Sequence, residues 1–224
     1  MRPLSESIHI PDHSDQEWQI DNLPNRLTII RVLLIPVIIG ALYITLFDIP
    51  WVTPYERLLG YFAAVVFIVA SVTDFLDGFI ARRRQIVTVF GSFLDPIADK
   101  FLVVSSLIIL QEMGRIPVII VIILVLREMY ITALRLMAME RGISVPVGAL
   151  GKWKTTFQMI AIPLLMAYDT IGQISMALLG SIFIYLASLF SLYSAGQYSL
   201  GLLRKIKHLK KQKKKKKPPL SEGV

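Results

Sequence analysis

Long apolar stretches constrain this chain more than any other feature of its sequence. Six of them lie between residues 27 and 203, and each is near the roughly 20 residues that a helix needs to cross about 30 Å of hydrocarbon. Inside a bilayer the backbone must satisfy its own hydrogen bonds, so helices are the expected form. We therefore predict an all-α membrane protein, a six-transmembrane-helix bundle. The predicted spans are residues 27–47, 58–80, 93–111, 117–139, 153–173 and 176–203.

Charge divides the chain into three regions. Residues 1–24 form a polar N-terminal segment, residues 25–203 the six-helix membrane domain, and residues 204–224 a basic tail. The tail holds ten Lys or Arg and one acid, a charge of +9, so residues 1–203 carry −1 of the net +8. Because the tail follows a membrane helix directly, we expect it to meet membrane lipids and no nucleic acid. Either it attracts anionic headgroups or it is a solvated segment that fixes topology.

Basic residues are unevenly distributed between the predicted loops. The run Arg82–Arg84 follows the second span, further basic residues separate the fourth and fifth, and the basic tail follows the sixth. On the opposite side, Arg57 and Arg115 are the basic residues of the loops. The positive-inside rule then places both termini in the cytoplasm. We expect a multi-pass protein of a bacterial inner membrane.

Four aspartates gather where the second and third spans meet the cytoplasm. Asp74 and Asp77 are three residues apart, and Asp95 and Asp99 are four apart, so each pair shares one helix face. A short loop makes these helices antiparallel neighbours, and the four carboxylates can converge. The chain has no cysteine, and its three histidines lie outside the spans. Carboxylate oxygens are the ligands that Mg²⁺ prefers, and two shared metal ions can bind a diphosphate.

Spacing alone leaves other roles open for these acids. An aspartate at a helix start, such as Asp95, is favoured by the helix dipole. That explanation does not suit Asp74 and Asp77, which fall near a helix C-terminus. Acids within membrane spans can also mark a transport path, so a divalent cation transporter is the alternative from another functional class.

The aspartates belong to a longer pattern, Asp-x2-Asp-Gly-x2-Ala-Arg-x8-Gly-x3-Asp-x3-Asp, which resembles the signature of the CDP-alcohol phosphatidyltransferase family. All eight positions match, as Asp74, Asp77, Gly78, Ala81, Arg82, Gly91, Asp95 and Asp99. The resemblance implies a membrane enzyme with a polar cavity open to the cytoplasm, which is expected to form a homodimer. Its substrate would be CDP-diacylglycerol, and its cofactor two ions of Mg²⁺ or Mn²⁺.

The resemblance also implies roles for individual residues. Metal ligands would be Asp74, Asp77, Asp95 and Asp99. The CDP group would meet Asp74, Asp77, Gly78, Ala81, Arg82 and Gly91. Asp99 would also be the catalytic base for the acceptor hydroxyl.

Further motifs, between about Asn22 and Tyr198, resemble family members whose acceptor is glycerol 3-phosphate. The phosphate of that acceptor needs cations, and cations in apolar spans rarely face lipid. The predicted phosphate-binding residues are Arg31, Arg127, Arg135, Lys152 and Lys154, and the predicted supporting residues are Asn25, Thr28 and Thr155. Snorkelling or internal ion pairing are the alternatives for these cations. Glu128 is expected to orient a neighbouring cation rather than to bind metal.

We therefore expect transfer of a phosphatidyl group from CDP-diacylglycerol to glycerol 3-phosphate, with release of CMP. Two rivals within the family differ in the acceptor. One is a cardiolipin synthase, which uses phosphatidylglycerol, and the other is an inositol-phosphate lipid synthase.

Overall fold

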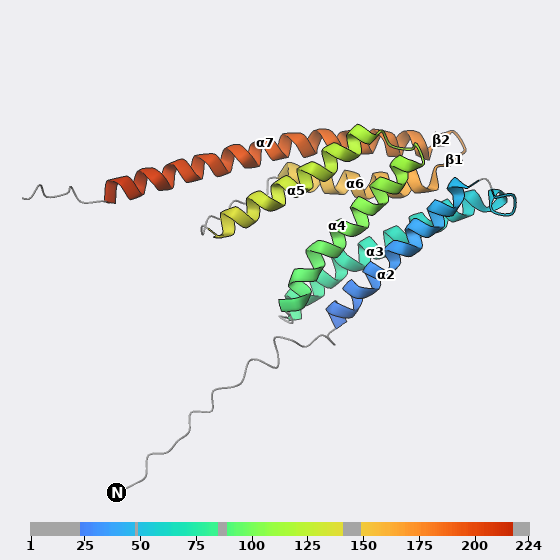
Figure 1. The fold of residues 1–224 in the computed structure, drawn as a ribbon, viewed down its shortest axis with the longest axis horizontal. Helices are drawn as coiled ribbons and strands as arrows, with labels where there is room; N and C mark the ends of the chain where they lie inside the picture. The colour runs from blue at the N-terminus through green and yellow to red at the C-terminus, as the bar shows by residue number, and fades with distance from the viewer. Residues whose placement is uncertain (1–22, 48, 85–88, 141–148, 217–224) are drawn as a thin grey trace, which may run out of the picture.

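The computed structural model of the chain is built almost entirely of α-helices (Figure 1). It describes the backbone of residues 23–47, 49–84, 89–140 and 149–216, and the side chains of residues 28–47, 49–73, 97–98, 100–140 and 150–208. The helices are α2 (Leu23–Tyr43), α3 (Glu56–Arg84), α4 (Val89–Glu112), α5 (Val118–Glu140), α6 (Ala149–Ala167) and α7 (Met176–Lys216). Two 3₁₀ turns, η1 (Ile44–Leu46) and η2 (Thr53–Tyr55), join α2 to α3.

Each predicted apolar stretch corresponds to one of these helices. Among the described residues, three segments are long and apolar enough to cross a membrane, namely Thr28–Leu46, Thr53–Thr73 and Met176–His208. The protein is therefore a mostly helical membrane protein, as the sequence predicts.

The segment between α6 and α7 differs from the prediction. Residue 173 was the expected end of the fifth span, but α6 ends at Ala167. Tyr168 and Gly172 have positive φ angles of 46° and 62°, which an α-helix does not accommodate. The chain turns instead through a small antiparallel hairpin of β1 (Thr170–Ile171) and β2 (Ile174–Ser175).

The last helix also runs further than its predicted span. Helix α7 continues past residue 203 to Lys216 as one element of 41 residues. Lysine is a good helix former, so the basic segment extends the helix rather than ending it.

The helices form two connected groups (Figure 1). Helix α2 packs against α3 and α4, while α7 packs against α6 and α5, and the α3–α6 contact joins the groups. Fully buried side chains from five helices fill the shared core: Leu42, Phe67, Leu110, Ile162 and Ile184. Apolar side chains such as Leu58, Val65 and Leu178 are exposed instead, as expected of surfaces that face lipid.

Close contact between α3 and α6 depends on Gly60. A Cβ atom at this position would lie 2.6 Å from the carbonyl oxygen of Met166. Small residues let helix backbones approach one another in membranes. The two helices are therefore in backbone contact at this point.

Polar contacts tie the helices together at the end of the bundle near the hairpin. Asp169 forms an ion pair with Arg57 and accepts a 2.7 Å hydrogen bond from the hydroxyl of Tyr61. The hydrogen bond from Tyr61, together with Arg57, lowers the pKa of the Asp169 carboxyl. Arg115 donates to the carbonyl oxygens of Leu165 and Met166 at the end of α6, at 2.8 and 2.7 Å. This end of the bundle lies away from the aspartate-bearing ends of α3 and α4.

Candidate active site

The structure places the signature residues on two consecutive helices, α3 and α4. Asp74 and Asp77 lie in the last three turns of α3, and Asp95 and Asp99 lie early in α4. Figure 1 shows the end of α3 beside the start of α4, and the two helices are in contact. The backbone thus brings the two halves of the signature to the same end of the bundle.

The side chains of the eight signature residues lie outside the described set. The predicted metal and CDP contacts, which include Gly78, Ala81, Arg82 and Gly91, therefore stay predictions. Among the side chains that the structure does describe, no group of three or more His, Cys, Asp or Glu gathers. The predicted ligands are all carboxylates, and this donor set fits Mg²⁺ or Mn²⁺.

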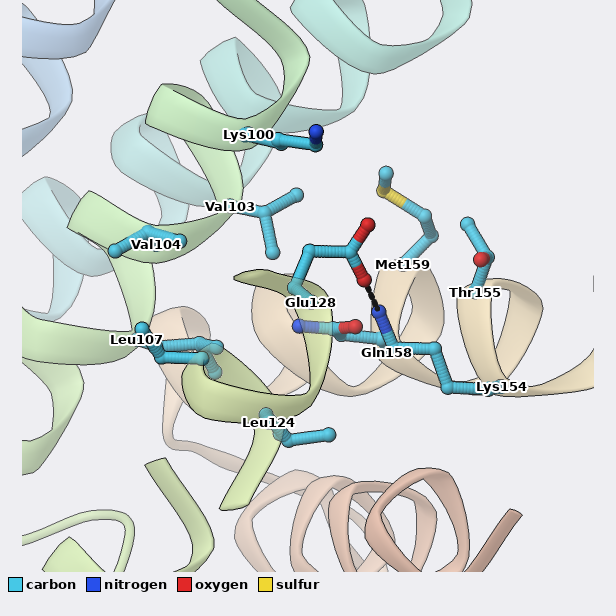
Figure 2. A pocket seen from close by; sticks show the side chains of 11 residues that line it. Lys100, Val103, Val104, Leu107, Leu124, Glu128, Lys154, Thr155, Gln158 and Met159 are labelled. Carbon is cyan, nitrogen blue, oxygen red and sulfur yellow. Dashed lines mark hydrogen bonds and ion pairs between the residues drawn. The ribbon is translucent and has the colours of Figure 1, made fainter. Parts of the chain in front are cut away.

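A cavity lies between α4, α5 and α6 (Figure 2). One of its lining residues, Lys100, directly follows Asp99 in the sequence. Its volume is about 50 Å³, space for a few water-sized groups. Polar side chains line one part, and they are Lys100, Glu128, Lys154, Thr155 and Gln158. Apolar side chains line the rest, and they are Val103, Val104, Leu107, Leu124, Val125 and Met159. Ammonium groups and an apolar wall together suit a small anionic molecule with a carbon skeleton.

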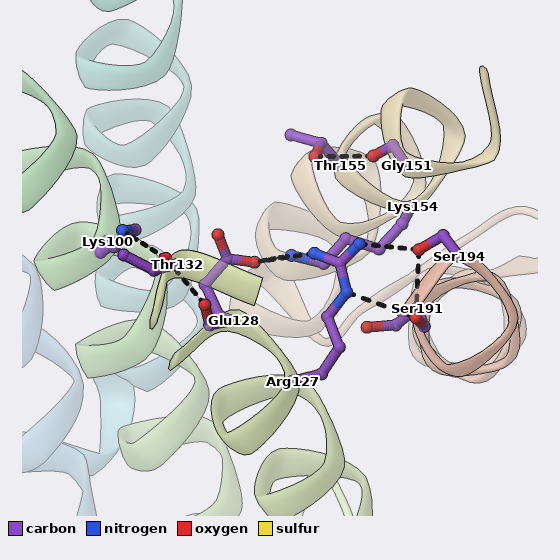
Figure 3. Close-up of polar contacts among 9 residues, drawn as sticks. All are labelled: Lys100, Arg127, Glu128, Thr132, Gly151, Lys154, Thr155, Ser191 and Ser194. Carbon is purple, nitrogen blue, oxygen red and sulfur yellow. Dashed lines mark hydrogen bonds and ion pairs between the residues drawn. The ribbon is translucent and has the colours of Figure 1, made fainter. Parts of the chain in front are cut away.

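Glu128 is the centre of the charged contacts around this cavity (Figure 3). Its Oε2 atom accepts a hydrogen bond from the Lys154 ammonium at 2.9 Å and one from Arg127 Nη1 at 3.2 Å. The Lys154 and Arg127 side chains are only 7% and 9% exposed, whereas Glu128 is 30% exposed. Glu128 thus pairs with two neighbouring cations, and its role in orienting them stays a prediction.

A second lysine is connected to Glu128 through a threonine. The Lys100 ammonium donates to Thr132 Oγ1 at 2.9 Å, and that hydroxyl donates to the backbone carbonyl of Glu128 at 2.8 Å. Three cations and one carboxylate thus lie together, and Lys100, Arg127, Lys154 and Glu128 have a combined charge of +2.

Arg127 also joins α5 to α7. Its Nη2 atom donates to Ser194 Oγ at 2.7 Å, and its Nε atom donates to the carbonyl oxygen of Ser191 at 3.3 Å. Three of its donors are therefore used within the protein (Figure 3). This is the internal pairing that the sequence left open, and it fixes α7 against the cavity wall.

The other predicted acceptor residues have different environments. Arg31 and Thr28 are both buried at 2% exposure, as expected for polar groups that avoid lipid. Arg135 and Lys152 are exposed, and the Arg135 guanidinium lies over the Tyr198 ring at 5.9 Å. The side chain of Asn25 is outside the described set.

Among the predicted phosphate-binding cations, Lys154 lines the described cavity, and the supporting residue Thr155 lines it too. The sequence did not single out Lys100, Thr132 or Gln158 for this site. Lys100 directly follows Asp99, and Thr132 is one helical turn after Glu128. Their positions beside these two acids could have indicated both residues from the sequence.

Comparison of the sequence with models of known protein families shows to which family the chain belongs. The model of the CDP-alcohol phosphatidyltransferase family matches residues 21–193. The chain belongs to this family. The match spans helices α2 to α6 and the first part of α7, so it includes both the signature helices and the cavity.

Similar proteins of this family share one name, CDP-diacylglycerol–glycerol-3-phosphate 3-phosphatidyltransferase. The protein of Rickettsia bellii is 38% identical over 179 residues, which is 80% of this chain and 93% of that protein. The Bacillus subtilis protein is 36% identical over 185 residues, 79% of this chain and 93% of its own length. The Haemophilus influenzae protein is 38% identical, with 79% of this chain and 91% of that protein covered.

Proposed function

We propose that the chain transfers the phosphatidyl group of CDP-diacylglycerol to sn-glycerol 3-phosphate, with phosphatidylglycerol phosphate and CMP as products. The similar proteins carry the name of this reaction. The observation that carries the proposal is the cationic cavity that begins at Lys100, next to the signature residue Asp99. An acceptor with its own phosphate suits a cluster of net positive charge.

The acceptor phosphate binds among the cations on the cytoplasmic half of the bundle. Lys154 is buried and lines the cavity, which supports direct contact with the phosphate. Arg127 is bound to Ser194 and Glu128, so its first role is to fix the cavity wall. In this proposal Arg31, Arg135 and Lys152 complete the positive surroundings, and Asn25, Thr28 and Thr155 support them.

The reaction needs little covalent chemistry from the protein, because positioning and charge stabilisation dominate phosphoryl transfer. Asp99 takes the proton of the acceptor 1-hydroxyl. The oxygen then attacks the phosphorus that bears the diacylglycerol, and the bond from that phosphorus to CMP breaks. Asp74, Asp77, Asp95 and Asp99 would hold two ions of Mg²⁺ or Mn²⁺, which supply positive charge to the diphosphate. Gly78, Ala81, Arg82 and Gly91 would shape the nucleotide pocket.

The proposed setting is a bacterial inner membrane, crossed six times, with both termini and the polar cavity on the cytoplasmic side. The positive-inside distribution of Arg and Lys supports this orientation. Glycerol 3-phosphate would then enter from the cytosol, and the diacylglycerol chains would stay in the leaflet. The homodimer is a prediction from the family resemblance, and chemical crosslinking in membranes checks it.

One assay tests the activity and its rivals together. Purified protein in detergent receives CDP-diacylglycerol and Mg²⁺ with glycerol 3-phosphate, phosphatidylglycerol, inositol phosphate or no acceptor, and CMP and lipid products are measured. We expect CMP release with glycerol 3-phosphate and phosphatidylglycerol phosphate as its product. Release with another acceptor alone would identify a different member of the family. A transporter would release no CMP with any acceptor, and the same protein reconstituted into liposomes would show metal flux.

A further inference from the structure

Glu128 is an unexpected residue for an anion-binding cavity. Of the described residues that line the cavity, it is the only one with a carboxylate. Its negative charge opposes the binding of an anionic acceptor by Coulomb repulsion. A benefit that offsets this repulsion must therefore come from what Glu128 does to its neighbours.

The neighbours of Glu128 are the two ammonium groups that face the cavity from opposite helices. Lys154 on α6 contacts the Glu128 carboxylate directly, at 2.9 Å. Lys100 on α4 is held by Thr132, whose hydroxyl donates to the Glu128 backbone carbonyl. Figure 2 shows the two lysines reaching the cavity from separate helices, with Glu128 between them.

Lysine side chains lose much rotamer freedom when they are fixed. A binding site whose cations are already ordered avoids that loss when the ligand arrives, and it binds more tightly for that reason. A carboxylate that orders Lys154 can thus favour anion binding although its own charge opposes it, and the Thr132 hydroxyl orders Lys100 in the same way.

We infer that Glu128, together with Thr132, is a positioning residue for the phosphate of the acceptor. The Glu128 carboxylate holds Lys154, and the Thr132 hydroxyl holds Lys100, at fixed places on two sides of the cavity. The inference rests on the proposed function, because it assigns a role within the acceptor site of that reaction.

Charge and positioning predict opposite results for Glu128→Gln. If Glu128 acted only through its charge, loss of the carboxylate would lower the KM for glycerol 3-phosphate. Positioning predicts instead that this KM rises about tenfold, because small misplacements of binding groups are costly. We expect kcat and the KM for CDP-diacylglycerol to stay within about twofold, since the variant removes no contact to the reacting atoms.

Glu140→Gln is the matched control on the same helix. It removes the same charge from an exposed position, 12 residues and about 18 Å along α5. We expect wild-type kinetics from it. A rise in KM common to both variants would show an effect that does not depend on the Glu128–Lys154 contact and would overturn the inference.

A pair of substitutions at Thr132 tests the second lysine. Thr132→Val keeps the shape of the side chain and removes the hydroxyl that holds Lys100, and we expect the KM for glycerol 3-phosphate to rise. Thr132→Ser keeps the hydroxyl, so it should restore the wild-type KM. Equal KM values for the two variants would contradict the role of the Lys100–Thr132 contact.

The outcomes separate this inference from the proposed function. Wild-type protein that releases no CMP with glycerol 3-phosphate would refute the function itself. Active wild-type protein, with an unchanged or lower KM in Glu128→Gln, would refute only the positioning role. Thermal midpoints within about 2 °C of wild type confirm that the variants are folded. If Glu128→Gln does not fold, the Thr132 pair decides the question.

Discussion

Substitution of Gly60 by alanine tests the packing on which the whole bundle depends. The added Cβ would lie 2.6 Å from the Met166 carbonyl oxygen, whereas ordinary contacts begin at 3.4 Å. To reach an ordinary contact distance, helices α3 and α6 would have to separate by up to 0.8 Å, the difference between 3.4 and 2.6 Å. Because the opposing atom belongs to the backbone, no side-chain rotation can relieve the overlap.

Two terms of opposite sign decide the size of the effect. Overpacking of this kind costs about 1–3 kcal/mol, and replacing glycine by alanine within a helix returns up to about 1 kcal/mol. With mid-range values of both terms, the net loss is about 1–2 kcal/mol. For a chain of this size that corresponds to a fall of roughly 2–8 °C in the thermal midpoint.

Thermal unfolding of the purified protein in one detergent measures this effect, with Gly40→Ala as the control. Gly40 also lies within a helix, but a Cβ there would meet no atom within 4 Å, so its midpoint should stay unchanged or rise. Helix α3 also carries Asp74 and Asp77, nearer its C-terminal end. A shift of α3 would displace these two aspartates, so we expect CMP release to fall in Gly60→Ala as well. Equal midpoints for the two alanine variants would refute the backbone contact between α3 and α6.

Four further predictions concern the site and the opposite end of the bundle. Asp99→Asn should abolish CMP release while CDP-lipid binding persists, and activity near the wild-type level would rule out Asp99 as the base. Thorough chelation of divalent metal should stop CMP release, and added Mg²⁺ should restore it, whereas turnover that survives chelation would exclude the metal model. Lys154→Met should lower kcat/KM for glycerol 3-phosphate roughly 10- to 100-fold, because a charge-assisted hydrogen bond contributes about 1.5–3 kcal/mol, while exposed Lys152→Met should have a smaller effect. The Asp169 carboxyl has a lowered pKa in the folded protein. Its ionised form therefore stabilises the fold at pH values above its ordinary pKa of 3.8, and this contribution is lost as the pH falls below that value. Asp169→Asn should accordingly reduce the acid-induced drop in thermal midpoint, and an identical pH profile in the variant would show that the Tyr61 contact contributes nothing.

The sequence predicts the helices because a bilayer leaves the backbone little choice. Every apolar stretch of about 20 residues corresponds to a helix, as expected of segments without water to satisfy an irregular backbone. The end of α6 was harder to predict. Its position depends on the turn at Tyr168 and Gly172 and on contacts of Asp169 with residues more than 100 positions away. Such contacts follow from packing, which apolar periodicity does not encode.

The candidate site was predictable to a different degree in each part. Glu128 and Arg127 are adjacent, so their pairing could be anticipated from the sequence and is confirmed. The contact of Arg127 with Ser194 joins residues 67 positions apart, and serines occur at many positions of α7. The sequence did not single out Lys100, because its partner Thr132 lies 32 positions away and meets it only once α4 lies beside α5.

Helix α7 determines how far the basic tail can move. Its 13 residues from Arg204 to Lys216 extend about 20 Å beyond the last predicted span residue. They continue a helix that is packed against α5 and α6, so they carry the chain onward along the axis of α7 (Figure 1). While it stays helical, this extension cannot fold back over the α4–α6 cavity. A reporter domain fused directly after Lys216, where this helix ends, should therefore leave turnover unaffected.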